Sequence, residues 1–296
     1  MYDIQKTESA KTVGEALEFL KENPDSVLVA GGTDVMIRLR HRKLKNAVVI
    51  NIREIPELSG IRKADDGTIR IGPGTCFDDI YRNEIIRAYI PILASACNQV
   101  GSPQIRHIAT IGGNLCNGAV SADSVPSLLA LDAMLEITSE NGIRKVPVCD
   151  FHSGPGKTVL DSGKEILTSI QISKESYENW SGYYYKFGQR NAMEISTLGC
   201  AATVRLDASK KHLEQMRLAF GVAAPTPVRC RKLESTAAGM EINEALFDFI
   251  RDHVLKELKP RDSWRASLEL REQLIKTMSV RAVKKAILLS GGNTGV

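Results

Sequence analysis

The sequence predicts an α+β protein, because short strands, hairpins and helices are mixed in it without a regular βαβ repeat. Residues 61–72 carry Asp66-Gly67 between two short apolar segments, a pattern that is typical of a β-hairpin. Residues 134–147 predict a second hairpin of the same kind. The chain ends, by contrast, in two long segments with helical apolar spacing, residues 242–258 and 264–289.

Composition and charge describe an ordinary globular chain. Charged residues make up 25% of the 296 residues and hydrophobic residues 43%, which is enough for a sizeable core. The length suggests two domains, or three small ones. The net charge of +4 is mild, and basic residues are not interleaved with aromatic ones, so we expect no nucleic acid partner.

The expected location follows from the N-terminus and from the cysteines. Charges at Asp3, Lys6 and Glu8 interrupt any apolar core of a signal peptide. No run of about 18 uncharged apolar residues occurs, so we expect no membrane span. The six cysteines stand at least 19 residues apart, which excludes CxxC motifs and argues against a cysteine-ligated iron–sulfur cluster. We therefore expect a reduced, cytoplasmic protein.

The first subdomain, residues 1–57, is expected to be a small α/β unit. Thr12 can cap a helix, with Glu15 at the capping-box position. Residues 27–30 are wholly apolar, which predicts a strand that is buried on both faces. The expected elements, in order, are a helix, a strand, a short helix and a second strand, at residues 12–22, 27–30, 35–39 and 47–52.

A second subdomain follows at residues 58–176, and a polar stretch at residues 173–180 suggests the boundary to a C-terminal domain, residues 177–296. Besides its two hairpins, the second subdomain is expected to contain helices at residues 78–82, 92–100 and 127–131. The C-terminal domain should hold a sheet and a helix pair, with Ser263 as the cap of the last helix. Its expected strands lie at residues 182–189, 197–206 and 215–222.

Two diglycine motifs are the strongest local signals. Gly31-Gly32 follows the strand at residues 27–30, and Gly112-Gly113 follows the β-branched pair Thr110-Ile111. A strand that ends in two glycines can turn sharply, because glycine reaches positive φ at little cost, and successive N–H groups then form a nest for an anion. Two such turns suggest two clamps on one long anionic ligand such as a dinucleotide. Two ordinary turns are the alternative.

Other motifs lead to no catalytic group. Residues 72–77 begin like a Rossmann fingerprint, but Phe77 stands where the third glycine is needed. Residues 156–158 imitate the end of a P-loop without its first glycine. The five histidines form no HxH or HExxH group, so no metal site is predicted. What remains is chemistry that a bound cofactor carries.

Three motifs taken together resemble one family. Residues 30–34 (AGGTD), 101–106 (GSPQIR) and 110–115 (TIGGNL) resemble the FAD-binding subunits of the molybdenum hydroxylases, and most closely the medium subunits of bacterial heterotrimeric xanthine dehydrogenases. The resemblance runs from end to end. Further support comes from residues 151–157, 220–228 and 263–267.

The resemblance implies an FAD-binding domain of the vanillyl-alcohol-oxidase (PCMH) type in two α/β subdomains, followed by a sheet-plus-helices domain that closes over the flavin. The two diglycine segments would hold the FAD pyrophosphate and its surroundings. The cofactor-binding residues implied in this way are Leu28, Val29, Ala30, Gly31, Gly32, Thr33, Asp34, Val35, Val100, Thr110, Ile111, Gly112, Gly113, Asn114, Cys116, Asp123, Leu167 and Lys186.

Five of these positions have an expected role, and all but Val100 have an ordinary alternative. Asp123 would accept hydrogen bonds from sugar or ribityl hydroxyls, or would cap the next helix. Lys186 would approach the flavin ring, although no catalytic residue is certain, or would be an exposed strand lysine. Leu167 would pack against the cofactor or only in the core, and Val100 would lie near the flavin ring. Cys116 would touch the flavin face or be an inert buried thiol.

The resemblance also implies a function. Electrons from a purine-like substrate would leave a molybdopterin-binding large subunit, pass through the [2Fe-2S] clusters of a small subunit, and arrive at this FAD, which would reduce NAD⁺. The chain would thus be one part of a complex. A free-standing flavin oxidoreductase with Glu194 as acid or base is the alternative, and a scaffold subunit with mere turns is a third hypothesis. The basic run at residues 38–45 is either a solvated helix end and loop, or a docking face or a contact to the charge of a ligand.

Overall fold

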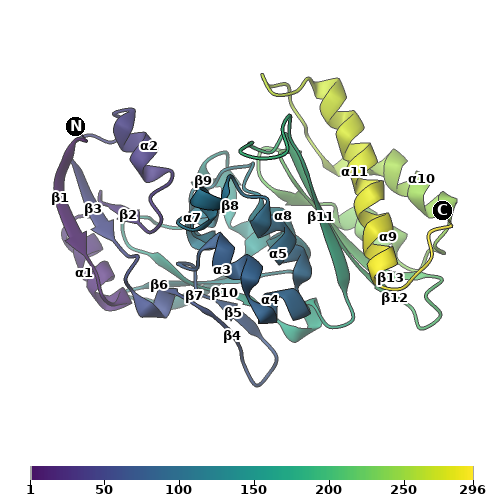
Figure 1. The fold of residues 1–296 in the computed structure, drawn as a ribbon, viewed down its shortest axis with the longest axis horizontal. Helices are drawn as coiled ribbons and strands as arrows, with labels where there is room; N and C mark the ends of the chain where they lie inside the picture. Colours follow the sequence, from purple (N-terminus) through teal and green to yellow (C-terminus); the bar gives the residue numbers. More distant parts are fainter. Residues whose placement is uncertain (1, 296) are drawn as a thin grey trace.

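The computed structural model describes residues 2–295 and shows an α+β fold built on three main sheets in chain order (Figure 1). The first sheet is parallel, with the strand order β1-β3-β2. Its strands and its two helices are β1 (Ile4–Ser9), α1 (Val13–Glu22), β2 (Val27–Val29), α2 (Val35–Arg40) and β3 (Ala47–Asn51).

The second sheet is antiparallel, with the order β4-β5-β10-β6-β7. Short helices between β5 and β6 pack on it, and a small β8-β9 hairpin stands beside them (Figure 1). These elements are β4 (Ile61–Lys63), β5 (Ile69–Ile71), α3 (Phe77–Arg82), α4 (Glu84–Tyr89), α5 (Pro91–Asn98), α6 (Pro103–Arg106), α7 (Ile111–Cys116), α8 (Ser124–Ala130), β6 (Met134–Ser139), β7 (Gly142–Pro147), β8 (His152–Gly154), β9 (Lys157–Thr158) and β10 (Ile166–Ile172).

The third sheet, order β11-β12-β13-β14, is antiparallel and lies between two helical layers. Along its central strand, Ala201 packs into the core shared with α5 and α8, whereas Cys200 and Ala202 pack toward the C-terminal helices. This alternation follows from the period of two in a strand. The elements are β11 (Ser181–Phe187), β12 (Leu198–Leu206), β13 (Leu213–Gly221), β14 (Val228–Arg229), α9 (Arg231–Ala237), α10 (Glu244–His253) and α11 (Leu268–Leu289).

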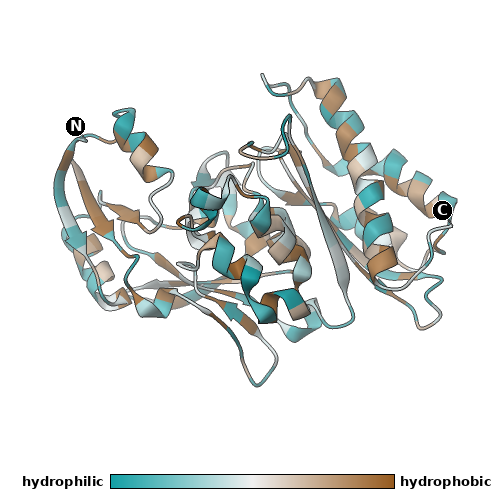
Figure 2. Ribbon diagram, viewed as in Figure 1, coloured by the Kyte–Doolittle hydropathy of each residue, from teal (hydrophilic) through white to brown (hydrophobic). Residues whose placement is uncertain are grey.

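Hydropathy explains the layers. Figure 2 shows helices that are apolar on one side and polar on the other, as a helix on a sheet must be. In the first subdomain, Ala16 and Leu20 of α1 are fully buried. Thr12 caps this helix as predicted, because its hydroxyl accepts from Glu15 N at 3.1 Å. Within residues 2–295, no helix combines the length and the apolar character that a membrane crossing requires.

Three local predictions are wrong. The strand at residues 27–29 is half-buried and not buried on both faces, because β2 is an edge strand of its sheet. Thr110 is not the end of a strand but the cap of α7, so Gly112 and Gly113 lie inside a helix. The last helix is capped by Ser267 and not by Ser263, since the Ser267 hydroxyl accepts from Leu270 N.

Candidate cofactor-binding cleft

A cleft of about 940 Å³ lies between the first subdomain and the rest of the chain. One wall comes from β2, the following loop and α2, and the other comes from α7 and the β8-β9 hairpin (Figure 1). The size is at the upper end of the range for ligand pockets, which is about 300–1,000 Å³. The cleft therefore suits a large ligand.

The first diglycine motif supplies unused backbone donors to this cleft. Within the described chain, the N–H groups of residues 31–34 have no protein acceptor. Gly32 has φ of +72°, as the sequence predicted for a turn of this kind. Gly31 is required for another reason, because a Cβ there would lie 2.2 Å from the carbonyl oxygen of Ile108. The turn thus packs directly on the opposite wall and leaves its N–H groups facing a ligand.

The second diglycine motif does not offer free N–H groups, contrary to the prediction. The N–H groups of Ile111, Gly112 and Gly113 donate to Thr75 O, Pro73 O and the Thr110 hydroxyl, so they form no open anion nest. Gly112 is needed for close packing, since a Cβ on it would lie 2.4 Å from the Pro73 Cβ. Neither glycine of this pair has positive φ. The segment therefore brings a bare helix surface to the cleft.

Fourteen of the eighteen predicted cofactor-binding residues line the cleft. Among them, burial raises the pKa of Asp34, and the Arg38 cation opposes this shift. Burial also raises the pKa of Cys116 to about 12, so this thiol stays neutral near pH 7. The four predicted residues that do not line the cleft are Val29, Ile111, Asp123 and Lys186.

Asp123 and Lys186 meet each other behind the cleft wall. Lys186 Nζ donates to Asp123 Oδ2 at 2.7 Å and to the Gln99 carbonyl at 2.8 Å. The side chains are only 10% and 8% exposed, so Lys186 is not an exposed strand lysine. Asp123 also accepts from Tyr184, at 2.8 Å, and from Ser196. Because it makes no capping bond to α8, the alternative of a helix cap is wrong.

This buried cluster fixes the position of the cleft wall at Val100. Gln99 directly precedes Val100, which lines the cleft, so the lysine bond to Gln99 O ties the strand β11 to that wall. Burial, and next the neighbouring Asp123 carboxylate, raises the pKa of Tyr184, which therefore remains a donor to Asp123.

Several cleft residues escaped the sequence prediction. Arg38 lines the cleft, which fits the alternative of a contact to ligand charge for the basic run, although Arg38 is not among the predicted cofactor-binding residues. Lys157 comes from β9, within the motif at residues 151–157 that supported the resemblance. Pro73 and Phe77 belong to a segment that we rejected as a Rossmann fingerprint. The remaining additions include residues 24–27 and members of the segments 105–109 and 153–162.

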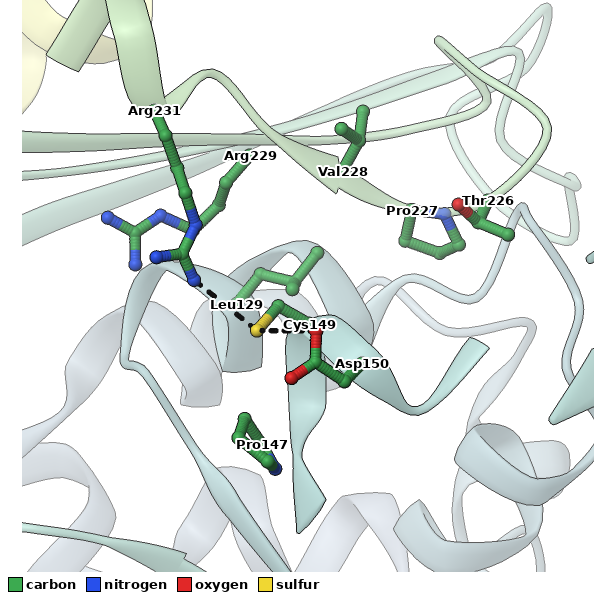
Figure 3. A pocket seen from close by; sticks show the side chains of 9 residues that line it. All are labelled: Leu129, Pro147, Cys149, Asp150, Thr226, Pro227, Val228, Arg229 and Arg231. Carbon is green, nitrogen blue, oxygen red and sulfur yellow. Dashed lines mark hydrogen bonds between the residues drawn. The ribbon is translucent and has the colours of Figure 1, made fainter. Parts of the chain in front are cut away.

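A second, smaller hollow of about 550 Å³ lies apart from the cleft, between β14 and the segment around Cys149 (Figure 3). There Arg231 Nη2 donates to the Cys149 sulfur at 3.3 Å, and the thiol donates to Asp150. Burial raises the pKa of the Cys149 thiol, with Asp150 adding to the effect and Arg231 opposing it. A neutral thiol is a weak nucleophile, so this hollow offers no evident chemistry.

The cleft combines free N–H groups, two cations and apolar walls. Backbone donors and the side chains of Arg38 and Lys157 suit a pyrophosphate. Val100, Leu167 and Cys116 give an apolar surface that suits a ring system. Within residues 2–295, no three His, Cys, Asp or Glu side chains are grouped as a metal site would need. Such an arrangement is built to hold a dinucleotide cofactor.

Fold and cleft define a flavoprotein, and comparison with known proteins agrees. Residues 3–174 match the family model of the FAD binding domain in molybdopterin dehydrogenase, and residues 183–286 match that of the CO dehydrogenase flavoprotein C-terminal domain. The chain belongs to the FAD-binding subunits of the molybdenum hydroxylase family and is xanthine dehydrogenase-like.

Individual relatives cover nearly the whole chain. The xanthine dehydrogenase FAD-binding subunit of Escherichia coli O157:H7 is 42% identical over 292 residues, which are 99% of each chain. The nicotinate dehydrogenase FAD-subunit of Eubacterium barkeri is 34% identical and covers 86% of this chain and 87% of its own. Among solved structures, carbon monoxide dehydrogenase from Hydrogenophaga pseudoflava superimposes with a TM-score of 0.91 at 26% identity, covering 98% of this chain and 99% of that chain.

Proposed function

We propose that this protein is the electron-exit subunit of a xanthine dehydrogenase-like complex, which takes electrons from [2Fe-2S] clusters of a partner subunit and delivers them to NAD⁺. The observation that carries the proposal is the cleft whose turn at residues 31–34 offers free N–H groups. The 42% identity to a xanthine dehydrogenase FAD-binding subunit supports the assignment to this type of complex.

The residues of the cleft have distinct proposed roles toward FAD. The N–H groups at residues 31–34 bind the pyrophosphate, and Arg38 and Lys157 balance its charge. Val100, Leu167 and Cys116 contact the ring. Flavin supplies both one-electron and hydride chemistry, which is what a subunit between clusters and NAD⁺ needs. Lys186 and Asp123 act by fixing the Gln99–Val100 segment.

The partners follow from the missing redox groups. The six cysteines of the chain are spread through the sequence, and no three potential metal ligands gather within residues 2–295. On the basis of the family, we assign the clusters to a [2Fe-2S] small subunit and the organic substrate, a purine or related N-heterocycle, to a molybdopterin-binding large subunit. The Escherichia coli relative is a xanthine dehydrogenase FAD-binding subunit, which supports a division of the redox groups between chains.

The test is an absorption spectrum of the purified chain, followed by anaerobic addition of NADH. We expect flavin bands that bleach on addition of NADH, because electron delivery to NAD⁺ is reversible. Flavin that stays oxidised would overturn NAD⁺ as the acceptor. A protein that binds no flavin even after FAD is supplied would overturn the assigned cleft itself.

The free-standing oxidoreductase gains no support from the position of Glu194. Its carboxylate bonds to Arg190 Nε at 2.8 Å and does not line the cleft. A carboxylate that is paired with an arginine outside the cleft is poorly placed as an acid or base toward a ring bound there.

A further inference from the structure

Three arginines gather where the chain enters α11. Arg261 and Arg265 belong to the loop before the helix, and Arg271 belongs to its second turn. Arg271 is only 1% exposed, and its Nη2 donates to the Ser263 hydroxyl at 2.9 Å. The Nε atoms of Arg265 and Arg271 are buried without a hydrogen-bond partner. Within residues 2–295, none of these three guanidinium groups has a carboxylate oxygen within 4.0 Å.

The start of α11 carries an excess of positive charge. Burial lowers the pKa of Arg271, and the neighbouring Arg261 and Arg265 cations act in the same direction. Asp262 is the carboxylate that opposes them, and it already accepts from Leu268 N at 2.7 Å. The positive end of the α11 dipole adds to the excess of positive charge. A buried cation that lacks an ionic partner is costly, so an anion bound at the accessible neighbours Arg261 and Arg265 would offset the cost of burying Arg271.

An aromatic face lies beside the arginines. Trp264 is 79% exposed, although tryptophan is normally well buried. The guanidinium of Arg265 stacks over one side of its ring at 4.1 Å from the centroid. The rest of the ring is open to solvent, so a planar base can stack on it.

This surface is joined to the cleft by hydrogen bonds. Gln189 Nε2, in the loop between β11 and β12, donates to the Arg265 carbonyl at 3.2 Å. In the same loop, Met193 N donates to the Gly101 carbonyl at 3.0 Å. Gly101 follows Val100 of the cleft wall. Figure 1 shows that the loop before α11 lies at the same end of the C-terminal domain as the β11-β12 loop.

We propose that this arginine–tryptophan surface (Arg261, Trp264 and Arg265, with Arg271 buried beneath it) binds the adenosine diphosphate half of the dinucleotide acceptor. The pyrophosphate lies against the guanidinium groups of Arg261 and Arg265, whose fork of donors matches phosphate oxygens. The adenine stacks on Trp264, and the nicotinamide end reaches over the β11-β12 loop toward the cleft. Met193 and Ile195 in that loop, 68% and 50% exposed, offer apolar contacts on the way. The inference rests on the proposed function, in which NAD⁺ is the acceptor.

The first test is a titration of the FAD-loaded subunit with ADP-ribose, which lacks the nicotinamide, monitored by tryptophan fluorescence. The chain has two tryptophans, and Trp180 is covered by Arg217 at 3.9 Å, so the response reports mainly on Trp264. We expect saturable binding, which weakens about tenfold or more in an Arg261→Ala/Arg265→Ala double variant. Arg251→Ala is the matched control, since Arg251 lies on α10 in ion pairs with Glu244 and Asp248.

The second test is rapid-kinetic reduction of the flavin by NADH. In the double variant, the apparent Kd for NADH should rise by about tenfold, while the rate of bleaching at saturating NADH stays unchanged, because only a remote binding contact is lost. Calorimetry of Trp264→Phe with ADP-ribose should show weaker binding with the flavin content intact. These readouts separate a dinucleotide site from a merely structural arginine cluster.

The outcomes distinguish this inference from the proposed function. If NADH bleaches the flavin equally well in wild type and double variant and ADP-ribose binds neither or both alike, the surface is not the dinucleotide site, although the acceptor is right. If NADH bleaches neither protein, the acceptor itself is wrong. If the double variant keeps its ADP-ribose affinity but no longer assembles with the partner subunits, the surface is a subunit interface and the inference is wrong.

Discussion

At the scale of single residues, the two diglycine motifs are held by close packing more than by turn geometry. A Cβ on Gly31 would lie 2.2 Å from Ile108 O, and a Cβ on Gly112 would lie 2.4 Å from Pro73 Cβ. We expect Gly31→Ala and Gly112→Ala each to lower the free energy of unfolding by about 1–3 kcal/mol or more, because backbone must shift. The flavin content of the purified protein should fall as well. Urea unfolding and visible absorption measure both effects.

A third glycine gives the control. Gly14 lies inside α1, and a Cβ there would have only ordinary contact with Thr12 Oγ1 at 3.7 Å. Because Gly14 lies in the first turn of the helix, Gly14→Ala should leave the free energy of unfolding unchanged or raise it by at most about 1 kcal/mol. If Gly31→Ala behaved like Gly14→Ala, the close approach of the two cleft walls would be wrong.

The Asp123–Lys186 pair is the second residue-scale feature that can be tested. Lys186→Met leaves the Asp123 carboxylate, 8% exposed, without its cation. We expect a loss of about 3–5 kcal/mol in the free energy of unfolding, the usual result when one partner of a buried pair is removed. Weaker FAD binding should follow, because the bond that holds Gln99 O beside Val100 is lost.

Lys174→Met removes a lysine from an exposed pair with Glu178 and is the matched comparison. Its cost should be at most about 1 kcal/mol, since solvent screens such pairs. If the two variants lost equal free energy of unfolding, the buried pair would stabilise the protein no more than an exposed pair does. The resemblance indicated both Asp123 and Lys186, but the sequence could not show that they bond to each other, because Asp123 directly precedes α8 and Lys186 lies on β11, far apart in the chain.

At the scale of secondary-structure elements, local patterns predicted many helices and hairpins but not the context of all of them. The capped helix α1 and the β4-β5 hairpin with its Asp-Gly turn are confirmed. Strand β1 (IQKTES) has no apolar alternation and forms only because it pairs with β3, so no local signal exists. The prediction of a strand end and a turn at residues 110–113 is wrong, because glycine is a poor helix former and the sequence gives no sign of α7 there. Close packing of Gly112 on Pro73 overrides that preference.

Helix α2 carries a prediction about partner binding. Its residue Ile37 is 51% exposed, and the segment that follows is basic. We expect Arg40→Glu/Arg42→Glu/Lys43→Glu to weaken assembly with the iron–sulfur subunit by about tenfold or more, through loss of attraction to an acidic surface. Arg38 is left in place because it lines the cleft. Co-purification and equilibrium binding at two salt concentrations measure the effect.

The control for the α2 variant must have the same change of net charge and one substitution at a residue with positive φ. Arg42 has φ of +54°, and Lys210 has φ of +58°. A Lys210→Glu/Lys211→Glu/Lys232→Glu variant therefore changes the net charge equally and includes one substitution in the same left-handed conformation. It should assemble as the wild type does, and both variants should keep their flavin. Unchanged assembly of the α2 variant would show that residues 40–45 are only a solvated surface.

At the scale of the whole molecule, the long-range arrangement was beyond the sequence argument. Strand β10 inserts between β5 and β6, which joins residues about a hundred positions apart into one sheet. The cleft likewise has walls from both subdomains. Only the fold shows that the motif at residues 151–157 contributes to one of these walls. The division into domains at residue 176 stays a prediction, although the sheet changes between β10 and β11.

Asp132, which lies between α8 and β6, makes one of the ionic connections between those two parts. Its carboxylate pairs with Arg217, at 3.0 Å, and with Arg229 of the third sheet. Burial lowers the pKa of Arg217, and Asp132 is the main group that opposes this shift. Arg217 therefore depends on Asp132, whereas Arg229 also has Glu234. Asp132 has φ of +47°, which asparagine tolerates well, so Asp132→Asn removes the charge with little backbone strain.

We expect Asp132→Asn to lower the free energy of unfolding by about 1–3 kcal/mol, the cost of a lost hydrogen bond to a charged group. Because the pair joins the flavin-binding part to the third sheet, the variant should also unfold in two steps where the wild type unfolds in one. Added FAD then stabilises by mass action only the part that binds it. In the wild type the single calorimetric transition should move up as a whole, whereas in Asp132→Asn only one of two transitions should move. A single transition in the variant that still shifts as a whole would mean that apolar packing, and not this pair, couples the two parts.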